Sequence, residues 1–157
     1  STKTHKLTGK TNYDFLYHKW LKNNSRQSKK IKFNFHSPTA FKAGNINMVL
    51  PDIKRIFDSL TWRWNFFQTS GNMLPEVTAS DWHDTWIISH FNLQSRILDF
   101  GNHKQLGFKG LFTLSLKDNS EDAKHIARLG CLLADYAFYA GIGYGTTKGM
   151  GMVNVEF

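Results

Sequence analysis

The C-terminal segment 139–157, YAGIGYGTTKGMGMVNVEF, combines backbone freedom with groups that can hold an anion. Glycine lets a backbone approach a phosphate closely and aim its N–H groups at it, and hydroxyl and ammonium groups add further donors. The segment therefore predicts a contact with a phosphate backbone; the alternative is a tight corner between a helix and a strand. The candidate binding residues are Gly141, Gly143, Gly145, Thr146, Thr147, Lys148, Gly149 and Gly151.

This glycine-rich segment does not match the two best-known nucleotide loops. A Walker loop needs a glycine directly before its lysine, but Lys148 follows Thr147, and no three glycines have the G-x-G-x-x-G register. Both of those loops run from a strand into a helix, where the phosphate meets the helix N-terminus. The segment here leaves a predicted helix and enters a predicted strand. We therefore expect neither ATP nor NAD, and no cofactor.

His36 is the histidine whose position best suits proton transfer or a contact with a bound polyanion. It ends the alternating segment 30–36 on its polar side, directly before Ser37. The alternative is an ordinary exposed histidine at a strand end. No two histidines have the H-x-x-x-H or H-E-x-x-H spacing of a zinc site, so we expect no metal. We interpret Cys131 as a core residue and His90 as a partly buried one.

The charge of the chain is concentrated near its start. The net charge is +8, and residues 1–44 contain ten Lys and Arg but one acid, whereas the remainder is close to neutral. Such asymmetry indicates a polyanion partner, with a solvated basic face as the alternative. No apolar run reaches the roughly 20 residues that cross a bilayer, so no membrane contact is expected. A single cysteine excludes an internal disulfide and fits a reducing compartment.

Hydrophobic periodicity predicts an α+β fold. Apolar residues alternate through 30–36, whereas in 51–64 they recur every three to four residues, as on one face of a helix. From residue 30 the order strand, helix, strand, strand, helix, strand is that of the ferredoxin-like (RRM-like) βαββαβ fold. We expect a basic helical extension or interdomain linker over 1–29 and the ferredoxin-like domain over 30–157. The expected elements are helices over 12–22, 51–64 and 120–140, strands over 30–36, 85–93, 106–116 and 152–157, and irregular loops over 37–47 and 67–84.

Five stretches, in order, resemble a known family. They are FNFHSPTAFK (33–42), LPDIKRIFDSLTWRWN (50–65), NLQSR (92–96), GFKG (107–110) and YAGIGYGTTKGMG (139–151). The chain resembles the C-terminal half of the CRISPR repeat-RNA processing endoribonucleases, the sixth Cas family of the RAMP superfamily. YDFLY (13–17) is also similar to the segment that joins the two domains of that family.

The resemblance implies two tandem ferredoxin-like domains that bind CRISPR repeat RNA through basic surface and the glycine-rich segment. Within the matching stretches it implicates Ser37, Thr39, Lys42 and Arg96 in RNA binding. It also implies metal-independent cleavage, in which the 2′-hydroxyl attacks the adjacent phosphate while a general base, commonly His, takes its proton. The family usually carries that His in its N-terminal domain. No catalytic residue is therefore expected here, and His36 is the candidate outside that expectation.

Two alternatives stay open at this stage. The first is a non-catalytic RAMP subunit that binds guide RNA inside a CRISPR effector complex, whose other subunits would be its partners. The second is a ferredoxin-like module that binds a small anion. The family also commonly has a basic residue at the position of Gly145, so Lys148 would have to supply the positive charge of this segment alone.

Overall fold

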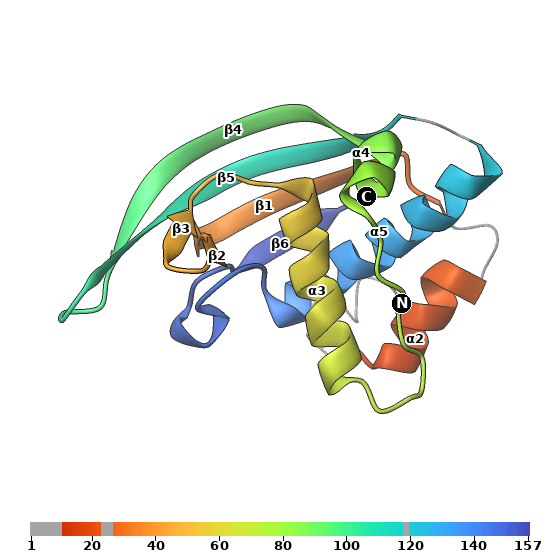
Figure 1. Ribbon diagram of the computed structural model, residues 1–157, viewed down its shortest axis with the longest axis horizontal. Helices are drawn as coiled ribbons and strands as arrows, with labels where there is room; N and C mark the ends of the chain where they lie inside the picture. Colours follow the sequence, from red (N-terminus) through yellow and green to blue (C-terminus); the bar gives the residue numbers. More distant parts are fainter. Residues whose placement is uncertain (1–10, 23–26, 118–119) are drawn as a thin grey trace.

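Four antiparallel strands form the sheet on which the molecule is built. The computed structural model describes residues 11–22, 27–117 and 120–157. The strand order is β4-β5-β1-β6, and every neighbouring pair is antiparallel. A long helix follows the first of these strands and another follows the third, which is the ferredoxin-like arrangement and confirms the predicted α+β fold (Figure 1). The strands are β1 (Lys30–Thr39), β4 (Trp86–Asp99), β5 (Lys104–Leu116) and β6 (Val153–Glu156).

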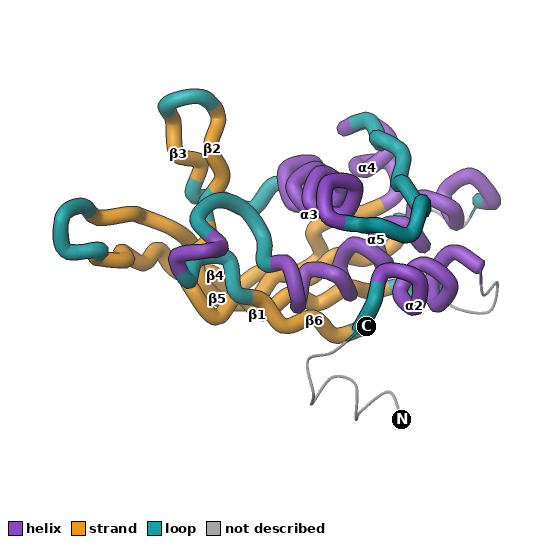
Figure 2. The backbone as a smooth tube through the Cα atoms, turned by 90° about the horizontal axis from the view of Figure 1, so that it is seen from below, coloured by secondary structure: helices purple, strands orange, loops and turns teal. Residues whose placement is uncertain are grey.

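One face of the sheet is covered by helices and the other is open among the described residues (Figure 2). The alternation in β1 explains why: Ile31, Phe33 and Phe35 are fully buried, whereas Lys32 and His36 are exposed. Burying one such apolar side chain contributes roughly 1.5–3 kcal/mol. The apolar side of β1 is therefore committed to the core, and its polar side lies on what we call the open face.

Helices α3 (Ile53–Phe67) and α5 (Glu121–Ala140) cover the apolar side of the sheet. Asp52 caps α3 by accepting a hydrogen bond from the Arg55 N–H at 2.8 Å, and Ser120 caps α5 in the same way. Gly141 ends α5 with a φ of 72°, a conformation that glycine adopts without strain. The buried stripe of α3 consists of Ile53, Ile56, Phe57, Leu60, Thr61 and Trp64.

The N-terminal extension packs onto α5. It comprises α2 (Tyr13–Tyr17) and the π-helical turn η1 (His18–Lys22), which bury Leu16 and Trp20. The largely buried Asp135 carboxylate accepts hydrogen bonds from Lys19 Nζ at 2.7 Å and from Trp20 Nε1 at 2.9 Å. These partners explain an acidic residue within the most apolar helix, because a buried carboxylate needs compensating donors. The described part of the extension shares its core with the sheet, while residues 1–10 lie outside the described structure.

Two segments predicted as loops contain regular structure. Strand β1 continues past Pro38, with irregular pairing between Phe35 and Thr39, and is followed by a hairpin of β2 (Phe41–Ala43) and β3 (Ile46–Met48). Proline is tolerated there because the ladder is already interrupted. Helix α4 (Ala79–Thr85) lies within the segment predicted as irregular. Its single buried tryptophan gives too little periodicity for a sequence-based assignment.

The β4–β5 hairpin is longer than predicted, and one buried position in it was assigned wrongly. Strand β4 ends at Asp99 and not at residue 93, and β5 begins at Lys104 and not at residue 106. The added residues are mostly exposed, so no alternation of buried and exposed positions marks them in the sequence. His90 is exposed, not partly buried, because the pairing shifts between Ile88 and His90. The interpretation of Cys131 as core is confirmed: it is fully buried, and burial raises the pKa of its thiol to about 12. None of the described helices is long and apolar enough to cross a membrane.

Candidate nucleic-acid interface

Close backbone packing requires two of the glycines in the segment between α5 and β6. A Cβ on Gly143 would lie 2.4 Å from the Ala40 carbonyl oxygen, and a Cβ on Gly151 would lie 2.0 Å from that of Ile142. Both glycines also have positive φ, 81° and 71°. Real Cβ atoms do not approach an oxygen this closely, and a side chain at positive φ is strained as well. The packing of a tight corner therefore requires these two glycines, and that they contact phosphate stays a prediction.

Two other glycines shape the part of the segment that projects into solvent. Gly145 and Gly149 flank the 3₁₀ turn η2 (Thr146–Lys148), and both have a left-handed backbone conformation. A Cβ on Gly149 would meet nothing within 4 Å. The N–H groups of Lys148, Gly149 and Met150 bond to carbonyl oxygens within the turn. Those of Gly145, Thr146 and Thr147 donate no hydrogen bond within the described part of the chain. These three donors are available to an anion.

Arg63 of α3 holds the segment from the helix layer. Its Nη1 donates to the Gly141 carbonyl oxygen at 3.0 Å, and its Nη2 donates to that of Gly143. Burial lowers the pKa of Arg63 from its ordinary value, although a guanidinium remains protonated at neutral pH. Arg63 is not among the residues predicted from sequence. Its place on the helix could have been recognised, because Arg55, Ser59 and Arg63 are four residues apart and therefore form one polar stripe along the helix.

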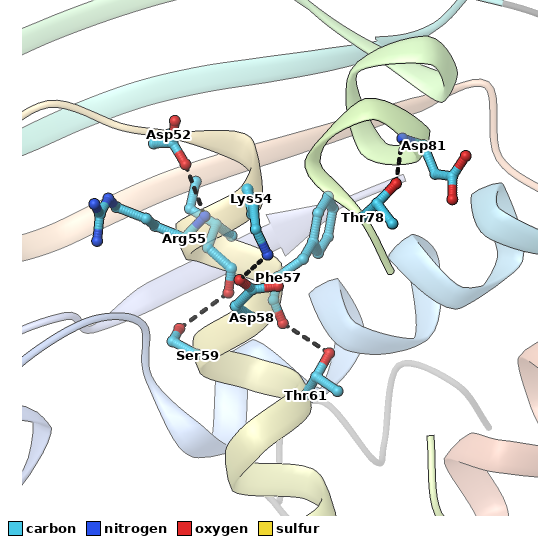
Figure 3. Close-up of polar contacts among 10 residues, drawn as sticks. Asp52, Lys54, Arg55, Phe57, Asp58, Ser59, Thr61, Thr78 and Asp81 are labelled. Carbon is cyan, nitrogen blue, oxygen red and sulfur yellow. Dashed lines mark hydrogen bonds and ion pairs between the residues drawn. The ribbon is translucent and has the colours of Figure 1, made fainter. Parts of the chain in front are cut away.

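Two further cations lie beside Gly143. The Lys42 ammonium lies 4.1 Å from the centre of the Tyr144 ring, and Arg55 lines the same hollow of about 290 Å³ between β2, α3 and the glycine-rich segment. Asp58 also lines it but is paired with Lys54, whereas the Arg55 side chain points away from that pair (Figure 3). Positive charge therefore predominates in this hollow. We call residues 141–151, with Lys42, Arg55 and Arg63, the loop corner.

The tip of the β4–β5 hairpin also meets the loop corner. Lys148 Nζ lies 5.7 Å from the centre of the Phe100 ring, in the turn between the two strands. In both ribbon views the glycine-rich segment, the β2–β3 hairpin and this turn lie at the same end of the molecule (Figures 1 and 2). Segments far apart in sequence thus bring one exposed lysine, one aromatic ring and free N–H groups together.

The predicted residues of the first strand have structural partners. Ser37 Oγ accepts a hydrogen bond from the Met152 N–H at 2.9 Å, which ties β1 to the end of the glycine-rich segment. Thr39 is fully buried and donates to the Ser37 carbonyl oxygen at 3.1 Å. That these two residues contact RNA stays a prediction, and the burial of Thr39 does not favour it.

His36 and Arg96 line a hollow that Lys148 does not line. The His36 N–H bonds to the Met152 carbonyl oxygen at 2.8 Å, but the His36 side chain lines a hollow of the open face together with Arg96. Apart from Ser37 and Thr39, the predicted site residues therefore fall into two regions, the loop corner and the open face. Within residues 11–22, 27–117 and 120–157, no three His, Cys, Asp or Glu side chains are grouped as metal ligands.

Comparison with known proteins places this geometry in a family. The family model described as CRISPR-associated endoribonuclease Cas6 matches residues 33–153. CRISPR-associated endoribonuclease Cas6 of Streptococcus thermophilus is 23% identical over 122 residues, which cover 78% of this chain and 49% of that protein. The Cas6 endoribonuclease of Mycobacterium tuberculosis is 25% identical over 130 residues, covering 83% of this chain and 40% of that protein.

A solved structure agrees with these sequence matches. Thermus thermophilus Cas6 superposes with a TM-score of 0.70 at 25% identity, over 93% of this chain and 58% of that one. The chain thus spans about half the length of the curated relatives it matches. The family match runs from the first core strand to the last and includes the loop corner. The chain therefore belongs to the Cas6 family of CRISPR-associated endoribonucleases.

Proposed function

We propose that this chain binds CRISPR repeat RNA at the loop corner and, with the remainder of a full-length family member, takes part in cleaving it. Membership of an endoribonuclease family supports the substrate class. Because the chain spans about half the length of its curated relatives, we assign the cleavage to the whole protein and the holding of RNA to this half.

The proposal rests on the backbone N–H groups of the loop corner that donate no hydrogen bond within the described residues. The N–H groups of Gly145, Thr146 and Thr147 have no acceptor within the described residues, and Lys148 beside them is exposed. Arg63 fixes the preceding carbonyl groups and so keeps the segment in shape before RNA arrives. A preorganised set of N–H groups beside cations favours the phosphates of a nucleic acid, whose contacts position the strand without reading its sequence.

The chemistry we propose is transesterification within the RNA. The 2′-oxygen attacks the adjacent phosphorus, the bond from phosphorus to the 5′-oxygen breaks, and the products are a 2′,3′-cyclic phosphate and a 5′-hydroxyl. A base must take the 2′-proton, an acid must protonate the leaving oxygen, and cations stabilise the added negative charge. The internal hydroxyl is itself the nucleophile, so we propose that no metal-bound water is needed.

In this scheme the loop corner supplies charge and position, not the base. Its titratable side chains are lysine, arginine and tyrosine, which are protonated near neutral pH in their ordinary state. The His36 side chain, which could accept a proton, lies with Arg96 on the open face. We therefore propose that the base comes from the half of a full-length protein that this chain does not match.

One observation favours a second candidate, a module that binds a small anion. The hollow of about 290 Å³ lined by Lys42 and Arg55 is close to the lower end of the range for small-molecule sites. A thermal-shift assay with inorganic phosphate and with nucleotides separates the candidates. Stabilisation by a small anion at micromolar concentration, without RNA binding, would favour this second function.

The main experiment combines RNA binding with cleavage in EDTA. We expect the chain to bind the repeat RNA of its own CRISPR locus with an affinity that falls with salt, at a log–log slope of about −0.7 for each phosphate neutralised. The chain alone should leave the RNA intact, and the full-length protein should cleave it at one site in EDTA. An affinity independent of salt contradicts the phosphate contact. Cleavage by the chain alone that disappears in His36→Ala would place the base on this chain.

A further inference from the structure

The open face contains a hollow whose side chains differ in kind from those of the loop corner. It has a volume of about 320 Å³ and is formed by β1, β4 and β5. Leu111 is half-buried within it, so an apolar surface lies between the polar groups. Its polar lining consists of three amides, two permanent cations and one histidine: Asn34, Asn92, Gln94, Arg96, Lys109 and His36.

Strand register arranges these side chains in rows. Asn34 of β1 and Asn92 of β4 are the Cα partners of Leu111 on its two sides, so one amide stands on each side of the leucine. Two strand spacings separate these amides by about 10 Å at the backbone. Gln94 and Lys109 are partners in the next row, and Arg96 follows on β4. Arg96 donates hydrogen bonds to the Gln94 side-chain oxygen and to the Ser95 carbonyl, which fixes its direction.

This set of groups matches a nucleotide better than a simple anion. Cations alone would suffice for an inorganic phosphate, but Asn34 and Asn92 each add paired donors and an acceptor, the pattern on the edge of a nucleobase. Gln94 adds donors, because its oxygen accepts from Arg96. No carboxylate lines the hollow. The open face also carries Lys30 and Lys32 further along β1, with Glu156 near Lys32 at 3.9 Å. The charge of the face therefore suits a polyanion that continues beyond one nucleotide.

We propose that this hollow binds one unpaired nucleotide of the RNA and reads its base. The amides of Asn34, Asn92 and Gln94 contact the base edge, Leu111 lies against the base, and Arg96 and Lys109 hold the adjacent phosphate. The nucleotide is unpaired because a base in an A-form helix presents its edges only in grooves that side chains read poorly. The inference rests on the proposed function, and it assigns sequence preference to the open face and sequence-independent affinity to the loop corner.

The test is a base-preference assay on the chain. Short single-stranded RNAs that differ at one position, scanned along the repeat, are titrated by fluorescence anisotropy at fixed salt. We expect the unmodified chain to prefer one base at one position by about fivefold or more. The double variant Asn34→Ala/Asn92→Ala, which leaves the hydrogen bond from Arg96 to Gln94 in place, should lose that preference while it keeps affinity for the least-favoured RNA. Lys109→Gln should keep the preference and reduce the salt slope by about 0.7.

The matched control is Asn154→Ala, which removes an exposed amide of the same face from β6, outside the hollow. It should leave preference and affinity unchanged. Equal loss of preference in the control and in the double variant overturns the assignment to the hollow. Salt-dependent RNA binding without any base preference overturns this inference but leaves the proposed function standing. No RNA binding at all overturns both.

Discussion

The loop corner and the open face both gather polar groups, but they hold them by different means. At the loop corner, backbone atoms pack too closely for a side chain at Gly151, and Arg63 is bonded to two carbonyl groups. On the open face, the exposed side chains of Asn92, Gln94 and Lys109 extend from regular strands. Substitutions at the packed positions of the loop corner, Gly143, Gly151 and Arg63, should therefore change folding and binding together, whereas substitutions on the open face should change binding alone.

The largest expected effect is the loss of stability in Gly151→Ala. The new Cβ would lie 2.0 Å from the Ile142 carbonyl oxygen at a φ of 71°, so the free energy of unfolding should fall by about 3 kcal/mol or more. Urea denaturation followed by circular dichroism measures this change.

The control for this substitution is Gly149→Ala, where φ is 86° but the added methyl meets nothing within 4 Å. It should cost about 1–2 kcal/mol, the strain of positive φ alone. Equal losses in the two variants would show that the loop corner is not closely packed and would remove the contrast with the open face.

A smaller loss of stability is expected for Arg63→Met. It removes the two hydrogen bonds to Gly141 and Gly143 and should cost about 2 kcal/mol, together with RNA affinity. Arg55→Met, which removes a cation of the same helix without such bonds in the described structure, should change stability by less than about 0.5 kcal/mol. Chemical denaturation of both variants decides the comparison. A stable Arg63→Met variant would mean that the segment holds its shape without the helix layer.

The salt dependence of RNA binding should resolve single contacts at the loop corner. Lys148→Ala should reduce the log–log slope by about 0.7, without loss of stability, because this side chain is exposed. Lys124→Ala is the matched control, since that lysine lies on α5 and pairs with Glu121 at 2.7 Å. Its slope should equal that of the unmodified chain. An unchanged slope in Lys148→Ala would show that the turn does not contact phosphate.

The smallest expected effect is the chemical labelling of Cys131, a buried residue that belongs to neither region. Burial raises the pKa of this thiol to about 12, against about 8.5 for a free thiol, so it stays protonated in the native state. The stability from this shift is complete below about pH 8.5 and is lost as the pH rises toward 12. A thiol reagent at pH 8 should therefore label the native chain only through unfolding, since the thiolate is the reactive form.

Labelling of Cys131 then reports which variants loosen the core. Gly151→Ala should be labelled faster than the unmodified chain, and Asn92→Ala at the same rate. Rapid labelling of Asn92→Ala would contradict the view that the open face is independent of the core.

The strand and helix order of the fold was predictable because burial imposes a period on the sequence. The alternation of Ile31, Phe33 and Phe35 and the helical stripe of α3 both appear as expected. Elements with few buried residues were missed: helix α4, the β2–β3 hairpin and the outer β4–β5 hairpin. Their structure depends on pairing and on contacts with distant segments, which leave little periodicity in the local sequence.

The candidate site was predictable in part for a related reason. The glycine-rich segment is continuous in sequence, so its unusual composition marks it directly. Arg63 lies 78 residues before the Gly141 carbonyl that it holds, and no local pattern connects the two. The His36 side chain lies with Arg96 in a hollow of the open face, because it is on the opposite side of the sheet from the helices.

The sequence by itself determined the α+β class, the core side of β1 and the position of the glycine-rich corner. Periodic burial and the positive φ of glycine are local consequences of residue type, so they can be read along the chain. Only the tertiary structure decided that Arg63 fixes the corner, that Lys148 meets Phe100, and that the amides of Asn34 and Asn92 flank one leucine. These contacts join strands and helices far apart in sequence, and their distances follow from sheet register and helix packing.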